Sequence, residues 1–262
     1  MAATLFTMLG ACFTARGQQS PPQLQERGGA AAPHVESEQP LNDYQRSQMA
    51  EWARDFADLH RYHAANQEIG SPVSGERRVI FYGDSITDKW TLSQYFPGRN
   101  YINRGISGQT TSQMLVRFRQ DVINLDPDVV VILAGTNDVA GNTGPISIED
   151  IEGNITSMAE LARAHDIALV LSSVTPVNNY TPASQRFFAD RPPSQILRLN
   201  EWMKAYCAST NCYYLDYFDS MVDGSGLLKH EFSEDGLHPN DAGYKIMAPL
   251  AQSAIDKTMA SR

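Results

Sequence analysis

A serine and a histidine that could act together in nucleophilic catalysis stand far apart in this sequence. Ser85 follows Gly83 and Asp84 directly, at the point where an apolar run ends. His238 comes three residues after Asp235, in the stretch DGLHPN. A carboxylate so placed can hold one imidazole nitrogen, which leaves the other nitrogen free to take a proton from a serine hydroxyl. These three side chains predict a serine nucleophile with its own base and an acid that orients the base.

Both parts of this arrangement also have a purely structural interpretation. Ser85 could cap the helix that SITDKW would begin, and the Asp235–His238 loop could serve only to start the last helix. A three-residue serine motif is weak when it stands alone. Further partners are needed before the sequence favours catalysis.

Two more residues could stabilise the negative charge that forms when a serine attacks a carbonyl group. Gly108 lies in a predicted turn, where the absence of a side chain lets the backbone N–H approach a ligand closely. Asn137 follows the apolar run VVVILAG, and its neutral amide can donate to an oxyanion without needing a counter-charge. The alternative for Asn137 is a turn residue that bonds its own backbone.

The elements that must position these residues alternate between strands and helices. Apolar runs predict five strands, and segments of helical periodicity lie between and after them. This alternation predicts a doubly wound parallel sheet, whose ligand site lies beyond the carboxyl ends of the strands. Ser85, Gly108 and Asn137 should therefore meet at one edge of the sheet. The predicted strands span 77–84, 101–108, 128–138, 167–176 and 212–218, and the predicted helices span 111–125, 147–166, 194–209 and 241–260.

The region before the first strand differs in composition from the rest. Residues 1–40 are predicted to be a leader and a disordered linker, because a short apolar core precedes a stretch rich in Gln, Pro and Gly. The leader lacks a basic start, and Cys12 in LGAC is weakly similar to a bacterial lipidation site. Export to the periplasm or medium is expected, with lipoprotein anchoring through Cys12 or an uncleaved tail as alternatives.

One domain is predicted from residue 41 to residue 262. Its first part, 41–68, is expected to be an amphipathic helix that packs on the catalytic core at 77–258. The evidence is a set of apolar residues spaced three and four apart. They are Met49, Trp52, Phe56 and Leu59.

Charge and hydropathy exclude several function classes. The 262-residue chain has a formal net charge of −9, whereas nucleic acids and anionic membranes attract basic surfaces. No apolar run reaches the roughly 20 residues that span a bilayer. We therefore expect neither a nucleic-acid partner nor a membrane span. The sequence holds no pattern from which an oligomeric state follows.

The cysteines leave one question open. Cys207 and Cys212 flank a predicted turn between a helix and a strand, where they could form a disulfide in an oxidising compartment or stay as free thiols. No CxxC or Cys/His cluster indicates zinc.

Four sequence blocks, taken in order, resemble the SGNH subgroup of the GDSL esterases. They are FYGDSITDKW, NRGISGQTT, AGTND and DGLHPN, and the resemblance covers about residues 77–258. The G-x-S-x-G elbow of ordinary α/β-hydrolases is absent. The resemblance implies a flavodoxin-like α/β/α sandwich with a five-stranded parallel sheet.

The same resemblance implies a chemistry and assigns roles in it. It implies hydrolysis of carboxylic esters through an acyl-enzyme on Ser85, with no metal and no other cofactor. His238 would be the base, oriented by Asp235. The N–H groups of Ser85 and Gly108 and the amide of Asn137 would hold the oxyanion.

The substrate is less closely defined, because one scaffold serves many substrates. Trp90, Val139 and Tyr180 are expected to line the site, and the long segment 175–195 is expected to form a lid or acyl wall. Aromatic residues beside a shallow site favour a short acyl group, chiefly acetyl, on a small ester or a carbohydrate. The alternatives are a lysophospholipase or thioesterase acting on lipid acyl groups, and a carbohydrate-binding domain without activity.

Overall fold

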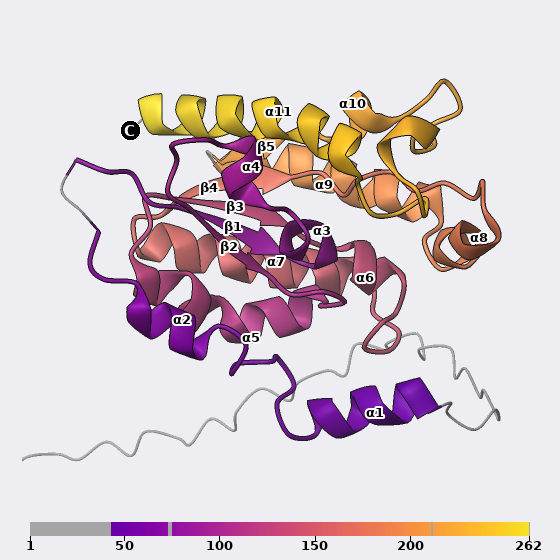
Figure 1. Cartoon of the computed structure of the whole chain (residues 1–262), viewed down its shortest axis with the longest axis horizontal. Helices are drawn as coiled ribbons and strands as arrows, with labels where there is room; N and C mark the ends of the chain where they lie inside the picture. Colours follow the sequence, from indigo (N-terminus) through magenta and orange to yellow (C-terminus); the bar gives the residue numbers. More distant parts are fainter. Residues whose placement is uncertain (1–42, 73–74, 211, 262) are drawn as a thin grey trace, which may run out of the picture. The chain divides into compact units, whose positions relative to one another are not determined.

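A parallel sheet lies at the centre of the structure (Figure 1). The structure is a computed structural model, and it describes residues 43–72, 75–210 and 212–261. Within these residues the sheet has five strands in the order β2-β1-β3-β4-β5, and each neighbouring pair is parallel. The strands are β1 (Val79–Gly83), β2 (Tyr101–Gly105), β3 (Val129–Leu133), β4 (Ala168–Ser172) and β5 (Tyr213–Leu215).

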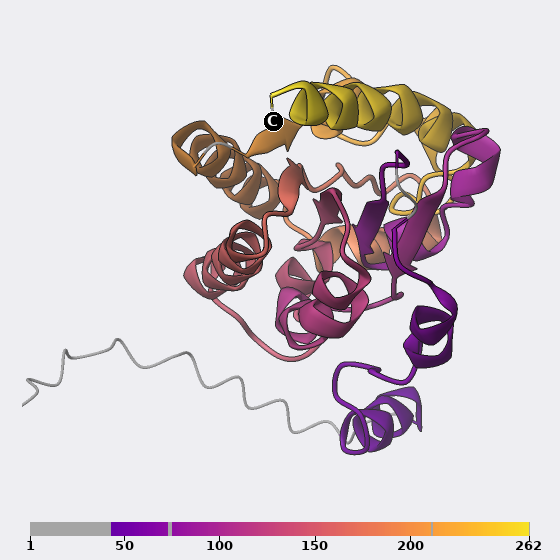
Figure 2. The ribbon, with the colours of Figure 1, turned by 90° about the vertical axis from the view of Figure 1, so that its left-hand side faces the viewer.

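Helices cover both faces of the sheet, as the view in Figure 2 shows. Strand residues alternate between two hydrophobic cores: Ile80 and Tyr82 belong to one, and Val79 and Phe81 belong to the other. This confirms the predicted three-layer α/β/α sandwich. The first core is covered by α5 (Thr111–Asp121), α7 (Ile148–Ala164) and α9 (Pro193–Thr210). The second is covered by α3 (Ser85–Asp88), α4 (Leu92–Tyr95), α10 (Phe218–Met221) and α11 (Asp241–Ala260).

The strand order brings three loops to one edge of the sheet. β1 pairs with β2 on one side and β3 on the other, so that Gly83 lies opposite both Gly105 and Leu133. The chain changes direction across the sheet here, and this is the position where doubly wound folds form their sites. The loops that follow β1, β2 and β3 carry the residues singled out from the sequence.

The observed strands are shorter than the predicted ones because their carboxyl ends leave the sheet to form these loops. The predicted strand 128–138, for example, ends at Leu133, and the chain then enters the short helix α6 (Thr136–Val139). The predicted lid segment 175–195 contains a further helix, α8 (Pro182–Ala189), which begins with a capping box at Thr181.

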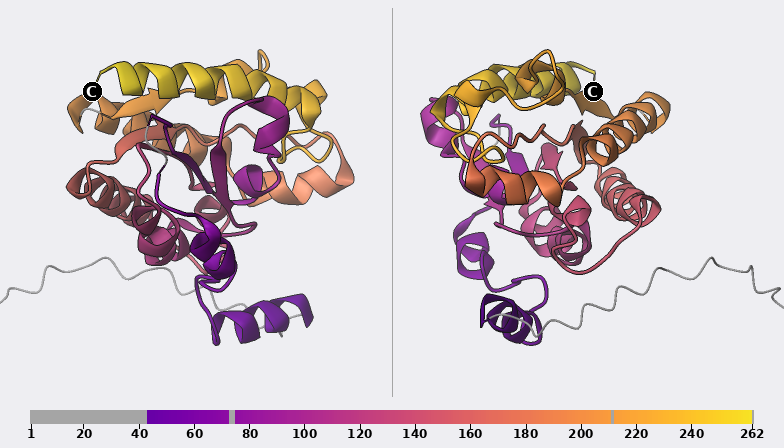
Figure 3. Two further views of the ribbon diagram at one scale, coloured as in Figure 1. Left: turned by 60° about the vertical axis from the view of Figure 1, so that its left-hand side comes forward. Right: turned by 90° about the vertical axis from the view of Figure 1, so that its right-hand side faces the viewer.

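The prediction of one amphipathic helix over 41–68 is wrong. The chain forms α1 (Asp43–Trp52) and α2 (His63–Glu68), separated by turns in which Asp58 adopts a left-handed φ of 54°. The predicted apolar face is not buried, since Met49, Phe56 and Leu59 are 52%, 41% and 38% exposed. In Figures 1 and 3, α2 lies beside α5.

Polar contacts, not an apolar face, attach this segment to the rest of the fold. Three glutamine side chains, one just before α5, one in its first turn and one in its last turn, donate to backbone carbonyls of the turns between α1 and α2. These bonds join Gln109 to Ala57 (2.7 Å), Gln113 to Phe56 (2.7 Å) and Gln120 to Leu59 (2.5 Å). The fold therefore holds residues 56–59 by their main chain.

Cys207 near the end of α9 and Cys212 just before β5 are joined by a disulfide in the structure. The predicted leader and linker, Cys12 included, lie outside the described residues. Of the helices that the structure describes, none is both long and apolar enough to cross a bilayer.

Candidate active site

Ser85, His238 and Asp235 form a continuous chain of hydrogen bonds at the carboxyl edge of the sheet. Nε2 of His238 lies 3.0 Å from Oγ of Ser85, and Nδ1 lies 2.6 Å from Oδ2 of Asp235. Ser85 is 7% exposed, and the His238 side chain is 17% exposed. An imidazole held between a carboxylate and a hydroxyl is arranged to accept the hydroxyl proton and to be stabilised once it is charged.

The Ser85 hydroxyl is free to take part because a different residue caps the helix. Asp84, the N-cap of α3, accepts the Ile86 N–H through Oδ1 at 2.9 Å, as expected for a residue that braces this loop. The turn into α3 is tight enough to require glycine before it. A Cβ on Gly83 would lie 2.3 Å from the Thr87 hydroxyl and 2.7 Å from the Leu133 carbonyl.

The loop before α11 fixes the carboxylate that binds His238. Oδ1 of Asp235 accepts the N–H groups of Leu237 (3.0 Å) and His238 (2.8 Å), so the loop folds around the carboxylate. Burial by itself raises the pKa of Asp235, but the hydrogen bonds from His238 and Leu237 outweigh this effect and hold the pKa at about 2. Asp235 is therefore ionised wherever the protein is folded near neutral pH.

The pKa of His238 is lowered from its ordinary value. Burial is the largest cause, because it penalises the charged imidazolium, and the positive charges of Lys89 and Arg191 act in the same direction. The Asp235 carboxylate opposes these effects without cancelling them. His238 is thus mostly neutral at pH 7, as a proton acceptor must be.

Gly108 and Asn137 lie on the loops after the two neighbouring strands. Gly108 has a left-handed φ of 81°, its carbonyl accepts a hydrogen bond from Asn142, and its N–H donates to no residue that the structure describes. Ser107 beside it donates to Asp88 at the end of α3 through both its N–H and its hydroxyl. The Gly108 loop is therefore attached to the helix that begins with Ser85.

The Asn137 side chain is 3% exposed and is held at both ends. Its Nδ2 donates to the Gln109 carbonyl at 3.0 Å, and its Oδ1 accepts from Nη2 of Arg191 at 3.1 Å. An amide nitrogen carries two hydrogens, so one remains for another acceptor. Sequence reasoning missed Arg191. It stands in the polar stretch ADRPPS, which resembles an ordinary exposed loop.

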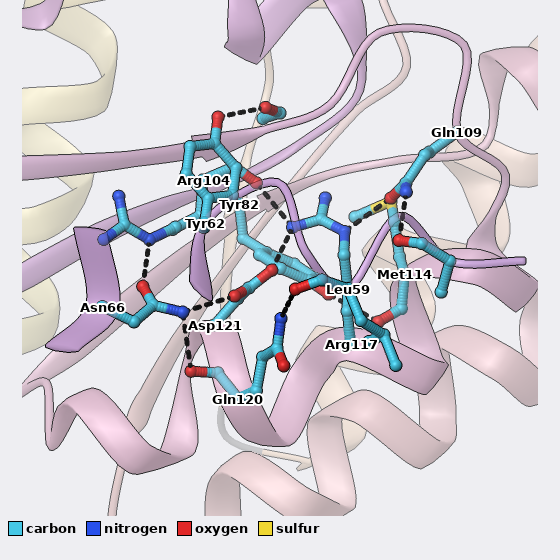
Figure 4. Close-up of polar contacts among 12 residues, drawn as sticks. Leu59, Tyr62, Asn66, Tyr82, Arg104, Gln109, Met114, Arg117, Gln120 and Asp121 are labelled. Atoms are coloured by element: carbon cyan, nitrogen blue, oxygen red, sulfur yellow. Dashed lines mark hydrogen bonds and ion pairs between the residues drawn. The ribbon is translucent and has the colours of Figure 1, made fainter. Parts of the chain in front are cut away.

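A second buried arginine braces the same loops from beneath (Figure 4). Arg117 of α5 is fully buried and donates to the backbone carbonyls of Gly83 (2.9 Å) and Arg104 (2.9 Å). It also bonds the Gln109 side chain at 2.5 Å and pairs with Asp121 at 3.2 Å. Its signal in the sequence was an arginine on the apolar face of a helix with an aspartate four residues later.

A buried carboxylate connects the Asn137 loop to the Gly108 loop. Asp138 is 2% exposed, and its two oxygens accept the Thr111 N–H at 3.0 and 2.9 Å. The contact places a negative group at the N-terminus of α5, a favourable position for it. The loops after β2 and β3 are therefore fixed to one another.

The residues predicted to line the substrate site have different environments. The prediction for Trp90 is wrong: the ring is 2% exposed, stacks on Tyr244 at 5.1 Å between centroids and belongs to the core under α11. Val139 is half-buried at the end of α6. Tyr180 is half-buried too, and its hydroxyl bonds the Ser233 carbonyl near the Asp235 loop.

Comparison with known proteins places this fold and these loops in a family. Residues 81–246 match the model of the GDSL-like lipase/acylhydrolase family. The crystal structure of a GDSL-like lipase from Bacteroides thetaiotaomicron is 44% identical, with a TM-score of 0.73, and the match covers 78% of this chain and 99% of that one.

Two curated proteins are more distant. An acetylxylan esterase of Geobacillus stearothermophilus is 25% identical over 67% of this chain and 91% of its own length. An uncharacterized lipoprotein of Bacillus subtilis is 29% identical over 41% of this chain, and the match spans only 52% of that lipoprotein. The family match takes in every block on which the site was built, so the chain belongs to the GDSL-like lipase/acylhydrolase family and is a hydrolase that acts on esters.

Proposed function

We propose that the protein hydrolyses carboxylic esters through an acyl-enzyme on Ser85. The observation that carries this proposal is the hydrogen-bonded chain from Ser85 through His238 to Asp235. Ser85, Gly108 and Asn137 follow three neighbouring strand ends, and this supports an oxyanion site made from the N–H groups of Ser85 and Gly108 and the amide of Asn137.

The reaction would proceed in two halves. Oγ of Ser85 attacks the ester carbonyl carbon while Nε2 of His238 takes the hydroxyl proton, and the carbonyl oxygen becomes an oxyanion. When the tetrahedral intermediate collapses, the bond to the alkoxy group breaks and His238 returns the proton to the departing alcohol. Water then attacks the acyl-Ser85 ester, His238 takes one water proton, and its return to Oγ releases the acid.

Replacing Asn137 by alanine should lower kcat by about a hundredfold to a thousandfold, with little change in KM. The amide interacts with charge that exists only in the transition state, so its loss affects the chemical step more than binding. Steady-state kinetics with p-nitrophenyl acetate measure this, and Asn100→Ala, at an exposed position before β2, is the control. A kcat for Asn137→Ala equal to that of the control would remove Asn137 from the oxyanion site.

The pH profile should reflect the lowered pKa of His238. The base acts in its neutral form, and a lowered pKa keeps it neutral to more acidic pH, so activity is lost only as pH falls through this lowered value. The acid limb of kcat/KM should therefore lie below the ordinary histidine value of about 6.5. Rates measured from pH 4.5 to 9 provide the test, and a limb above that value would contradict it. Lys89→Met, which removes one of the positive charges, should move the limb upward.

We infer that the substrate carries a short acyl group, chiefly acetyl, on a carbohydrate. The similarity to an acetylxylan esterase over 91% of that enzyme's length supports this. The rim of the Gly108 loop is polar: Asn142 bonds the Gly108 carbonyl, and Thr143 contacts Thr110 at 3.2 Å between hydroxyl oxygens. Such a rim suits a hydroxyl-rich alcohol better than a lipid chain.

An experiment on the proposed function has two arms. A fluorophosphonate probe should label the wild-type protein and not Ser85→Ala, whereas equal labelling of both would exclude Ser85 as the nucleophile. p-Nitrophenyl esters from acetate to octanoate, beside acetylated xylan and pectin, should give the highest kcat/KM for acetate and release acetic acid from a polysaccharide.

One observation favours the lipid alternative. The Phe187 ring of α8 lies edge-on to the His238 ring, with 6.0 Å between centroids, and offers an apolar wall beside the base. If octanoate or a lysophospholipid is hydrolysed faster than acetate, this wall holds an acyl chain and the lipid function replaces the carbohydrate one.

We also propose that the protein is exported. The disulfide between Cys207 and Cys212 suits an oxidising compartment, and one relative is a lipoprotein. Cell fractionation with an antibody to the native chain tests this proposal, and recovery in the cytosol alone would contradict it.

A further inference from the structure

Arg191 is a buried cation that the reaction outlined above does not use. It lies just after α8, is 4% exposed and has its guanidinium beside α6, which carries Asn137. Its Nε donates to the Thr136 hydroxyl at 3.1 Å, and its Nη2 donates to Oδ1 of Asn137 at 3.1 Å. Its Nη1 donates to the Phe187 carbonyl at 3.4 Å, which connects α6 to α8. Burying a guanidinium is costly, so this placement calls for a reason.

The contact with Asn137 determines which way the amide points. A guanidinium has donors and no acceptor, so only the oxygen end of the amide can face Arg191. The Gln109 carbonyl on the other side is an acceptor, and it requires the NH₂ end. The two partners agree, and together they turn the NH₂ group of Asn137 toward the Gly108 loop.

We propose that Arg191 is a positioning residue for the oxyanion site, which holds the Asn137 amide in its donating orientation. This inference rests on the proposed ester hydrolysis. Because the charge-assisted bond to Oδ1 also polarises the amide, it makes the remaining N–H of Asn137 a stronger donor.

The charge of Arg191 has a second, separable effect. It faces Asp84 after β1, Asp190 beside it in sequence, Asp235 on the loop before α11, and His238. It is one of the groups that lower the pKa of His238, with Lys89 acting in the same direction and Asp235 in the opposite one. Burial raises the pKa of Asp84 to about 7, and Arg191 opposes that rise. Removing the charge should raise the pKa of His238 and of Asp84 alike.

Two substitutions separate the orienting contact from the charge. Arg191→Met removes both, so kcat should fall about tenfold to a hundredfold with KM changed less than about threefold, and the acid limb of kcat/KM should move upward. Arg191→Lys keeps the positive charge but loses the planar guanidinium. Its kcat should therefore fall, while the acid limb of its kcat/KM profile stays at the wild-type pH. Arg186→Met, at an exposed position of α8, is the control.

A double-mutant cycle shows whether Arg191 acts through Asn137. In the Asn137→Ala background there is no amide to orient, so Arg191→Met should lower kcat by less than about threefold further. General damage to the fold would instead lower kcat by the same factor in both backgrounds. Urea unfolding midpoints identify any variant that fails to fold, and Arg191→Lys then takes the place of the methionine variant in the cycle.

Two results would overturn the inference. One is a wild-type kcat in Arg191→Met, and the other is a full multiplicative loss in the double mutant. Either result leaves the proposed function intact, provided that Ser85→Ala is inactive in the same assay. If Ser85→Ala hydrolyses the ester at the wild-type rate, the proposed function fails, and the inference about Arg191 fails with it.

Discussion

Ser85→Ala is expected to lower turnover of p-nitrophenyl acetate by at least about 10⁴-fold. The variant removes the only atom that can form the acyl-enzyme in the proposed reaction, so no later step can compensate. Only the oxyanion donors and substrate binding remain, and these accelerate hydrolysis weakly. His238→Ala should cause a loss of similar size, because Ser85 and His238 act as one unit.

The fold should survive both changes. Ser85 is the first residue of α3, and the loss of its hydroxyl leaves no buried carboxylate unpaired, so the free energy of unfolding should change by less than about 1 kcal/mol. In His238→Ala, Asp235 keeps the backbone N–H groups of Leu237 and His238 as partners. Ser93→Ala and His165→Ala, both at exposed positions, are the matched controls. An active Ser85→Ala protein of native stability would disprove the assignment of the nucleophile.

Arg117→Met is expected to cause the largest loss of stability, about 3 kcal/mol or more. The side chain is fully buried, and its removal leaves Asp121 without its cation and takes one donor from each of the carbonyls of Gly83 and Arg104. Its guanidinium also lies 4.2 Å from the centre of the Tyr82 ring, a contact that methionine would make only in part. Urea unfolding measures the change through the shift in midpoint.

The matched control for this prediction lies two residues away. Arg119 is exposed on the same helix, and Arg119→Met should cost less than about 0.5 kcal/mol. Arg117→Lys keeps the charge but lacks the planar fork that reaches several carbonyls. Its loss of stability should therefore lie between the losses of Arg117→Met and Arg119→Met. Equal unfolding midpoints for Arg117→Met and Arg119→Met would mean that this network adds nothing to stability.

The sequence predicted the sheet well because its strands have a simple pattern. VVVIL at residues 129–133 is buried on both faces, and a continuous apolar run is typical of such a strand. Ser85 and His238 were found because each stands in a short motif at an element boundary, where loop residues carry function.

What the sequence did not predict depends on contacts between distant segments. The apolar spacing of Met49, Phe56 and Leu59 is that of an amphipathic helix, yet within the part of the chain that the structure describes these side chains stay exposed. In the sequence, Arg191 cannot be distinguished from an exposed arginine of a polar loop. Only the fold brings Asn137 of α6 beside its guanidinium. The prediction for Trp90 is wrong because the sequence does not distinguish an aromatic residue that lines a site from one that packs in the core, as Trp90 does on Tyr244.

The glutamine contacts to residues 56–59 have a consequence for how the protein can diverge and be engineered. Gln109, Gln113 and Gln120 bind main-chain carbonyls, which every type of residue carries. The exposed side chains of Phe56 and Leu59 are therefore free to vary among relatives without loosening the attachment. For the same reason, a cysteine placed at position 56 is a natural point for a fluorescent label or a surface tether that leaves the ester site undisturbed.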